Sequence, residues 1–212
     1  MILLSSLFGL VFGSFLNVII YRLKTRQNII FDGSFCPECK KKLKWFDLVP
    51  LLSFIYLRGR CRYCHKKISW QYPIVEILSG LIWVFAWNSI YHIFILSALL
   101  VIAVYDFKWR IIPDKIVYPA IAVALIYNVF NFPLDKGGLW GVLLTAAAAF
   151  LFFFLIFYFS KGGAMGLGDV KLAFLIGLFL SPLLAITAFM LAFVIGAVFG
   201  IILIGLGKKS LK

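Results

Sequence analysis

The chain alternates between long runs of apolar residues and short polar segments. A transmembrane helix needs about 20 mainly apolar residues, and several runs approach that length. The sixth run is short and has Pro182 near its end, so it is expected to tilt or to cross only part of the bilayer. The fold class is therefore an all-α polytopic membrane protein. The pattern predicts about seven transmembrane helices, at residues 2–21, 73–89, 92–107, 114–130, 138–159, 169–182 and 184–206.

One sizeable polar part of the chain lies between the first and second apolar runs. We therefore divide the chain into a first transmembrane helix at 1–21, a polar loop at 22–72 and a helical membrane domain at 73–212. Within the loop, residues 43–57 are largely apolar but are broken by Pro50. This stretch is too short to span a bilayer comfortably. Its aromatic residues and basic flanks predict that it lies in the membrane interface.

Composition and charge support this topology. Hydrophobic residues make up 64% of the chain and charged residues only 14%, against roughly 25% charged residues in soluble domains. The net charge is +13, but the basic residues are confined to loops, which argues against nucleic-acid binding and is typical of membrane orientation. The expected topology has the N-terminus outside and the polar loop in the cytosol. All but one of the 21 lysines and arginines, Lys136 being the exception, fall in the inner segments 22–72, 107–115, 160–171 and 207–212.

The apolar N-terminal run is not expected to be a cleaved secretory signal. No basic residues precede it, and Arg22, Lys24 and Arg26 follow it in place of a small-residue cleavage site. We expect this run to be retained as a membrane helix.

All four cysteines lie in the polar loop as two Cys-x-x-Cys pairs, Cys36 with Cys39 and Cys61 with Cys64. The spacing is close to that of a zinc ribbon, and a cytosolic location disfavours disulfides. Four thiolates fill the tetrahedral coordination of zinc, so the predicted site is structural. A bound ion would supply folding free energy that this polar loop cannot gain from a core. Four free thiols or a redox pair are alternatives, and His65 could replace one cysteine ligand.

Two aspartates lie at cytosolic boundaries of the predicted helices. Asp106 ends one apolar run, and Asp169 follows a glycine-rich segment at residues 162–168. Ionisable residues in such positions are costly and tend to be functional. Glycines permit positive φ angles and the close approach of another chain, which favours a segment that accommodates substrate. The simpler interpretations are a carboxylate paired with Lys108 or Arg110 for Asp106 and a helix N-cap for Asp169.

Two carboxylates that come close share a proton, because both cannot ionise cheaply. The ionised member can activate a water molecule while the protonated member polarises a carbonyl group, which hydrolyses an amide bond. We hypothesise that Asp106 and Asp169 meet at the inner face of the membrane and cleave a peptide bond, although the pattern alone does not show that the two side chains are close. The alternatives are a small proton-coupled membrane transporter and a zinc-loop scaffold without chemistry. The cysteine loop and the lack of an obvious inverted repeat argue against the transporter.

Three other polar residues have structural interpretations. Asp114 follows Pro113 and is predicted to begin a helix, where a carboxylate caps free N–H groups. Ser14 and Asn17 lie on the first helix and are expected to hydrogen-bond a neighbouring helix.

Several longer motifs occur in order along the chain. Together they resemble the type IV prepilin leader peptidases of bacteria, and the resemblance covers nearly the whole length. Lys24 and Gln71 depart from it, at positions where the family often has proline and arginine. The motifs are Gly13-Ser14-Phe15-Leu16-Asn17-Val18 with Tyr21-Arg22-Leu23, the paired Cys-x-x-Cys, Leu57-Arg58-Gly59-Arg60-Cys61, Tyr72-Pro73-Ile74-Val75-Glu76, Asp106 leading to Ile112-Pro113-Asp114, and Gly166-Leu167-Gly168-Asp169-Val170-Lys171.

The resemblance implies an intramembrane aspartic protease of the Gly-x-Gly-Asp type, with Asp106 and Asp169 as its dyad, in the bacterial inner membrane. Such enzymes cut the short basic leader from prepilins and pilin-like secretion subunits on the cytoplasmic side. Many also N-methylate the new amino terminus with S-adenosylmethionine, which would make this protein bifunctional. The implied partners are prepilin or pseudopilin substrates and membrane lipid. Glu76 is then a helix-start carboxylate, or it binds the leader's basic residues or the methyl donor.

Overall fold

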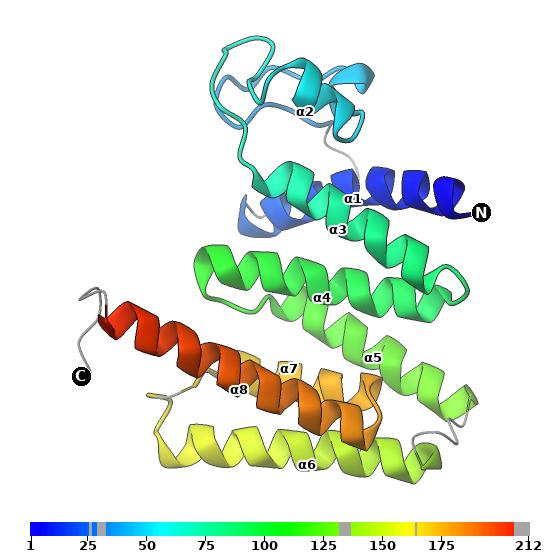
Figure 1. Ribbon diagram of the computed structural model, residues 1–212, viewed down its shortest axis with the longest axis vertical. Coiled ribbons are helices and arrows are strands. Elements are labelled where there is room, and N and C mark those ends of the chain that lie inside the picture. The colour runs from blue at the N-terminus through cyan, green and yellow to red at the C-terminus, as the bar shows by residue number, and fades with distance from the viewer. Residues whose placement is uncertain (26, 29–32, 132–136, 164, 206–212) are drawn as a thin grey trace. The chain divides into compact units, whose positions relative to one another are not determined.

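The computed structural model describes residues 1–25, 27–28, 33–131, 137–163 and 165–205. Arg26, Lys136 and residues 207–212, which contribute to the charge pattern, lie outside the described residues. The regular secondary structure of the described part is helical apart from two isolated β-bridges (Figure 1). Its elements, in order, are α1 (Ile2–Thr25), η1 (Trp45–Leu48), α2 (Leu52–Tyr56), α3 (Gln71–Ala86), α4 (Ile90–Trp109), α5 (Asp114–Asn131), α6 (Gly138–Phe159), α7 (Leu167–Phe179) and α8 (Pro182–Gly205).

Each of the seven predicted apolar runs corresponds to a helix, so the all-α prediction is confirmed. The helix ends follow local signals. The Ser89 hydroxyl accepts the His92 N–H at the start of α4, and Asp114 begins α5 as predicted. Pro182 begins α8 instead of lying near the end of the preceding helix, which suits a residue with fixed φ and no N–H to donate.

Four helices are long and apolar enough to cross a membrane. They are α1, α4, α6 and the Pro182–Ile202 part of α8. By contrast, α3 has 16 residues and α7 has 13. At 1.5 Å per residue, α7 is about 20 Å long, which is shorter than the roughly 30 Å hydrocarbon core of a bilayer. Length and composition of the described helices thus support four spans, and the total of seven stays a prediction.

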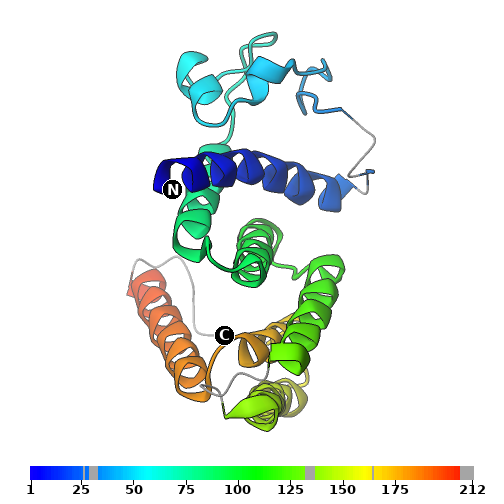
Figure 2. The ribbon, with the colours of Figure 1, turned by 90° about the vertical axis from the view of Figure 1, so that its right-hand side faces the viewer.

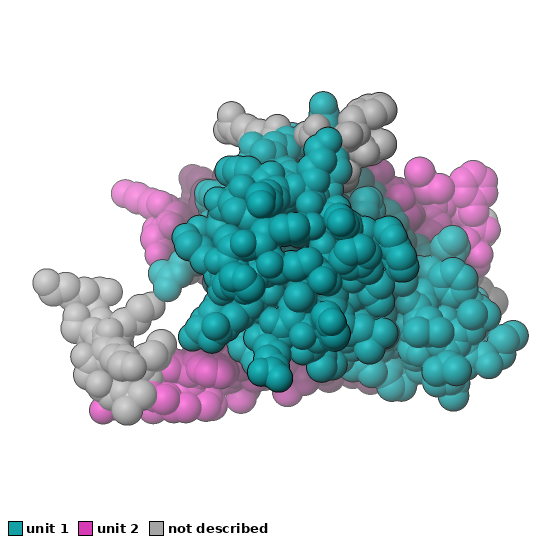
Figure 3. Space-filling view, turned by 90° about the horizontal axis from the view of Figure 1, so that it is seen from above, with its two compact units in different colours: residues 1–120 teal, residues 121–212 magenta. Residues whose placement is uncertain are grey.

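The chain divides into two compact units, residues 1–120 and 121–212, which Figure 3 colours separately. Unit 1 holds α1 to α4 and the first part of α5, and unit 2 holds the rest of α5 with α6 to α8. Each unit is described on its own below. The predicted division at residues 21 and 72 follows polarity along the chain instead of packing, and it stays a prediction.

In unit 1, α1 crosses α3 at very short range. A Cβ atom on Gly13 would lie 2.7 Å from the Cα of Glu76, and one on Gly9 would lie 2.8 Å from the Cα of Gly80. Glycine has no Cβ, so it allows the two backbones to come this close. The contact holds the last turns of α1 beside the start of α3. Next to it is a small core of side chains from α1, α3 and α4: Leu16, Ile20, Val75, Val101 and Tyr105.

The cysteine-rich segment leaves α1 and returns into α3, and Figures 1 and 2 show it as a small body at one end of unit 1. Arg22, which is 4% exposed, anchors its first part: the guanidinium donates to the Asn28 carbonyl at 2.9 Å and to the Gly33 carbonyl at 3.1 Å. Farther along, η1 and α2 leave large apolar side chains exposed. Among them are Trp45, Leu52, Ile55 and Tyr56, which agrees with the predicted interfacial position.

In unit 2, α6 and α7 form the most extensive contact. A Cβ atom on Gly177 would lie 2.6 Å from the Cα of Ala146, so this pair is also held at short range by a glycine. The Asn128 amide donates to the Leu178 carbonyl at 3.1 Å and joins α5 to the end of α7. The core beside these contacts contains Ala149, Phe153, Val170 and Ala173.

Candidate metal centre and active-site carboxylates

The first Cys-x-x-Cys pair forms a tight turn. The Lys40 N–H donates to the Cys36 carbonyl at 2.9 Å, and the Cys36 N–H donates to the Lys41 carbonyl at 3.0 Å. Lys40 has a positive φ of 60°, which reverses the chain directly after the second cysteine. An isolated antiparallel bridge between Phe35 and Lys42 closes the turn.

The second pair repeats this geometry. The His65 N–H donates to the Cys61 carbonyl at 3.0 Å, and the Cys61 N–H donates to the Lys66 carbonyl at 2.9 Å. His65 has a φ of 55°, and a bridge between Arg60 and Lys67 closes the turn. The two turns are therefore built alike, although their sequences share little beyond the cysteines and a following pair of lysines.

The two turns bring all four thiols together. The sulfur atoms of Cys36, Cys39, Cys61 and Cys64 all lie within 4.8 Å of one another, and those of Cys36 and Cys64 are 3.9 Å apart. All four cysteines are free thiols. Tetrahedral zinc with Zn–S bonds of about 2.3 Å requires sulfurs about 3.8 Å apart, so the cluster fits this ion. His65 is exposed and does not belong to the cluster found among the described residues.

Two ion pairs lie beside the cysteine cluster and connect its turns to neighbouring residues. Lys66, after the second turn, donates to the carboxylate of Glu38 within the first turn. This hydrogen bond lowers the pKa of Glu38 below its usual value. Arg62 donates to the Asp47 carboxylate at 2.8 Å, and its guanidinium lies 4.8 Å from the Phe46 ring centroid. These contacts join the cysteine turns to each other and to η1.

Asp106 lies in the last turn of α4, and it is exposed. Its carbonyl accepts the N–H of Arg110, which has a φ of 54° and ends the helix. Lys108, one proposed partner of Asp106, donates its ammonium to the side-chain carbonyl of Gln71 at 3.1 Å. The structure therefore places Asp106 at an exposed helix end, as the sequence predicts for a boundary carboxylate.

Asp169 lies in the first turn of α7 and is half-buried. Its carboxylate accepts the Gly166 N–H at 3.1 Å, so it caps the helix from within the first turn. This bond draws the start of α7 back to Leu167, ahead of the predicted run at 169–182. Asp169 belongs to unit 2 and Asp106 to unit 1, and their convergence stays a prediction.

Glu76 lies at a different place in its helix than predicted, and it contacts the polar loop. Since α3 begins at Gln71, Glu76 lies in the second turn of this helix and is not a helix-start carboxylate. It is only 7% exposed, and it accepts the Leu51 N–H at 2.9 Å. A residue of α3 thus holds the backbone of the polar loop. No sequence pattern links these two positions, because they lie 25 residues apart.

Asn17 confirms the predicted hydrogen bond between helices. Its amide donates to the Tyr72 carbonyl at 3.1 Å, and its side-chain oxygen accepts from the Gln71 amide at 3.3 Å. Gln71 also accepts from Lys108 of α4. Gln71 therefore connects three helices of unit 1, a role that sequence reasoning missed.

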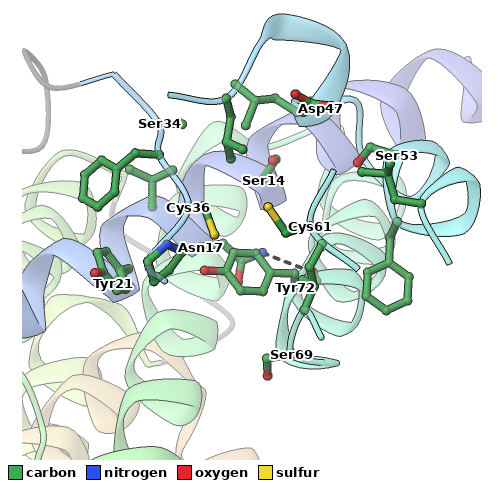
Figure 4. Close-up of a pocket in the computed structure, with 18 of the residues that line it drawn as sticks. Ser14, Asn17, Tyr21, Ser34, Cys36, Asp47, Ser53, Cys61, Ser69 and Tyr72 are labelled. Carbon is green, nitrogen blue, oxygen red and sulfur yellow. Dashed lines mark hydrogen bonds between the residues drawn. The ribbon is translucent and has the colours of Figure 1, made fainter. Parts of the chain in front are cut away.

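A pocket of about 400 Å³ opens between α1, the cysteine turns and the start of α3. Figure 4 shows Ser14, Asn17 and Tyr21 of α1 around it together with Cys36 and Cys61. Its lining combines aromatic rings with both signs of charge.

Comparisons with known proteins agree over most of the chain. Residues 7–90 match the bacterial peptidase A24 N-terminal domain, and residues 93–201 match the type IV leader peptidase family. The chain is similar to the prepilin leader peptidase/N-methyltransferase of Klebsiella pneumoniae, with 33% identity over 81% of this chain and 82% of that protein. It is also similar to the proteins of that name from Vibrio cholerae (34% identity, 91% of this chain and 84% of that protein) and Bacillus subtilis (32%, 92% and 79%). No solved structure is significantly similar. The chain therefore belongs to the type IV leader peptidase family.

Proposed function

We propose that this protein is a bifunctional enzyme of the bacterial inner membrane. It removes the basic leader from prepilins or pilin-like proteins at the cytoplasmic face and N-methylates the new amino terminus. The observation that carries this proposal is the family match, because it covers both the peptidase segment and the N-terminal segment with the cysteine cluster. Family membership favours this function over a transporter or a scaffold.

We assign peptide-bond cleavage to Asp106 and Asp169. The two carboxylates occupy opposite kinds of helix end. Asp169 lies at the N-terminus of α7, where free N–H groups favour negative charge, whereas Asp106 lies at the C-terminus of α4, where the carbonyl ends disfavour it. This contrast suits a division of labour in which Asp169 activates the water molecule and Asp106 donates a proton to the scissile carbonyl. The mechanism requires the two units to bring these side chains together around the substrate.

We assign zinc binding to Cys36, Cys39, Cys61 and Cys64. A four-thiolate site is closed, so the ion would supply folding free energy to the cysteine-rich segment and take no part in hydrolysis. The geometry of the sulfur atoms supports this assignment.

The proposed topology has seven membrane helices, the N-terminus outside, and the cysteine segment and both aspartates in the cytosol. It rests on the distribution of lysine and arginine together with the apolar helices. In this arrangement, α7 crosses only part of the bilayer, which leaves Asp169 accessible to water. A prepilin would keep its apolar segment in lipid and present its leader at the level of the aspartates.

The test uses the full chain, purified in detergent, with a full-length prepilin. We expect the leader to be removed with or without S-adenosylmethionine, and the cleaved product to gain one methyl group only when this donor is present. Electrophoresis measures the cleavage, and intact-mass spectrometry measures the methylation. An uncleaved prepilin that a known leader peptidase processes in parallel would overturn the proposal, and a cleaved product that never gains a methyl group would reduce the protein to a peptidase.

A further inference from the structure

The cysteine-rich segment exposes a group of large apolar side chains. Trp45 of η1 is 79% exposed and Tyr56 of α2 is 78% exposed, and Leu52, Ile55 and Trp70 are exposed as well. Residues 52, 55 and 56 have the spacing that places side chains on one face of a helix. The apolar surface, as we call it below, consists of Trp45, Leu52, Ile55, Tyr56 and Trp70.

The two short helices that carry most of this surface are held together by Arg62. Its guanidinium lies 4.8 Å from the ring centroid of Phe46 in η1 and 6.0 Å from that of Tyr56 in α2. It also donates to the Asp47 carboxylate of η1 at 2.8 Å. The apolar surface is therefore a fixed feature of the folded segment and not a set of unrelated side chains.

A hydrogen bond places α2 beside the first turns of α3. The Leu51 N–H, directly before α2, donates to the Glu76 carboxylate at 2.9 Å. On the same part of α3, Ile74 and Ile77 are exposed apolar side chains. In the proposed topology α3 begins at the cytoplasmic face, so the apolar surface would meet the headgroup region of that leaflet.

The same segment is strongly basic. Residues 33–70 contain nine lysines and arginines against two acidic residues, and all nine are exposed. Four thiolates on one zinc ion would add a charge of only about −2, so the segment stays positive with its metal. Arg62 and Lys66 pair with the two carboxylates. The other seven form no ion pair with any residue that the structure describes: Lys40, Lys41, Lys42, Lys44, Arg58, Arg60 and Lys67.

We propose that the cysteine-rich segment docks on anionic phospholipids of the adjacent leaflet. The apolar surface enters the headgroup region, and the basic side chains around it bind lipid phosphate groups. Lys42 and Lys44 precede η1, and Arg58 and Arg60 follow α2, so cations flank the apolar surface on both sides along the chain.

The charges predict a preference for one class of lipid. Apolar side chains alone would enter any fluid bilayer equally well, whereas each lysine or arginine near an anionic surface contributes about fivefold in affinity. The segment should therefore distinguish phosphatidylglycerol, which is anionic, from phosphatidylcholine, which is zwitterionic. This inference depends on the proposed topology but not on leader cleavage or methylation.

The first experiment compares the two lipids. The full chain, purified without chelator, is placed in nanodiscs of phosphatidylcholine with or without phosphatidylglycerol, one chain per disc, and hydrogen–deuterium exchange is measured for residues 43–57. We expect exchange at least about tenfold slower in the anionic discs, and a salt concentration of about 0.5 M should remove most of this difference. Equal exchange in both discs would overturn the proposal. So would equal protection by inorganic phosphate added to the phosphatidylcholine discs, because the ligand would then be a free anion.

Two variants with matched positions locate the effect. Lys42→Gln, Lys44→Gln, Arg58→Gln and Arg60→Gln, made together, should abolish the difference between the two discs. Exchanging lysine for arginine and arginine for lysine at the same four positions keeps the charge and should keep the difference. Zinc content, measured by elemental analysis, shows that the cysteine turns are intact in both variants. A zinc-containing glutamine variant that still prefers the anionic discs would contradict the role of these cations.

A third variant tests the apolar part. Leu52→Ser with Ile55→Ser keeps every charge and should speed exchange of residues 43–57 in both kinds of disc. Unchanged exchange in this variant would show that the apolar surface does not enter the bilayer. Protection that appears only in discs with two chains would assign the surface to a second copy and overturn the proposal. None of these results bears on leader removal, which the electrophoretic assay tests separately.

Discussion

The cysteine cluster and the aspartate pair are assembled in different ways. Each cysteine turn is a local structure of about eight residues, closed by its own backbone hydrogen bonds and a bridge, and one segment of unit 1 carries both turns. Asp106 and Asp169 lie on the ends of separate helices in separate units. A metal site can therefore form within a short loop, whereas the proposed dyad depends on the packing of whole helices. Substitutions in the cysteine cluster should therefore leave the aspartate pair largely intact, and substitutions of the aspartates should leave the cysteine cluster largely intact.

The largest effect is expected from the aspartates. Asp106→Asn and Asp169→Asn should each lower the rate of leader removal by at least about a thousandfold, because each removes the proton-transfer function of one carboxylate. Zinc content should change little, since each cysteine turn is closed by its own backbone hydrogen bonds and bridge. Gel-based cleavage assays and elemental analysis measure both properties. Cleavage at the wild-type rate by either variant would remove that residue from the dyad.

Loss of the metal should have the next largest effect, and it should be local. Structural zinc sites contribute about 10–16 kcal/mol of apparent binding free energy in small peptides, so Cys61→Ser should unfold the cysteine-rich segment. Limited proteolysis should then cut residues 33–70 while the α6–α7 pair of unit 2 stays protected. Treatment of the wild type with a strong chelator should give the same pattern. A zinc-free protein with a protected cysteine segment would contradict the structural role.

The glycines at the two helix crossings should have intermediate effects. A Cβ at Gly13 or Gly177 would lie within 2.7 Å of backbone atoms that cannot move aside easily, so Gly13→Ala and Gly177→Ala should each cost about 1–3 kcal/mol. Only Gly13→Ala should also disturb the segment that carries the cysteines. Gly196→Ala is the matched control, because its added Cβ would meet no atom within 4 Å apart from its chain neighbours and the nearby backbone of its own helix. Thermal unfolding in detergent measures the difference in melting temperature between each variant and the control. Equal melting temperatures in all three variants would contradict the close helix contacts at Gly13 and Gly177.

The smallest effect is expected from the exposed pair of Glu38 and Lys66. Its hydrogen bond lowers the pKa of Glu38 in the folded protein. The pair therefore stabilises the fold above the pKa of an unfolded glutamate, and this contribution is lost as the pH falls through the lowered folded value. Because both groups are exposed, Glu38→Gln should barely change the melting temperature at neutral pH and should not change it in acid. A large loss of stability in acid with this variant would contradict this account.

The apolar runs alone located α1 and α3 to α8 in the part of the chain that the structure describes, because long runs of apolar side chains have few structural alternatives. The predicted positions of the helix ends were less accurate than the predicted positions of the helices. The start of α7 depends on a side chain that accepts an N–H three residues earlier, and Glu76 was misplaced because α3 begins five residues before it. The zinc-ribbon spacing pointed to the four cysteines correctly, since each turn is encoded locally.

Sequence patterns were sufficient for features that are local or periodic: the helices, the cysteine turns, the boundary carboxylates and the motifs that identify the family. Tertiary structure decided which distant groups meet. It placed the Glu76 carboxylate against the backbone of Leu51, joined Asn17, Gln71 and Lys108 across three helices, and formed the pocket between them. These contacts depend on the close approach of α1 to α3, which glycines allow, and the residues that those glycines meet lie far away along the chain.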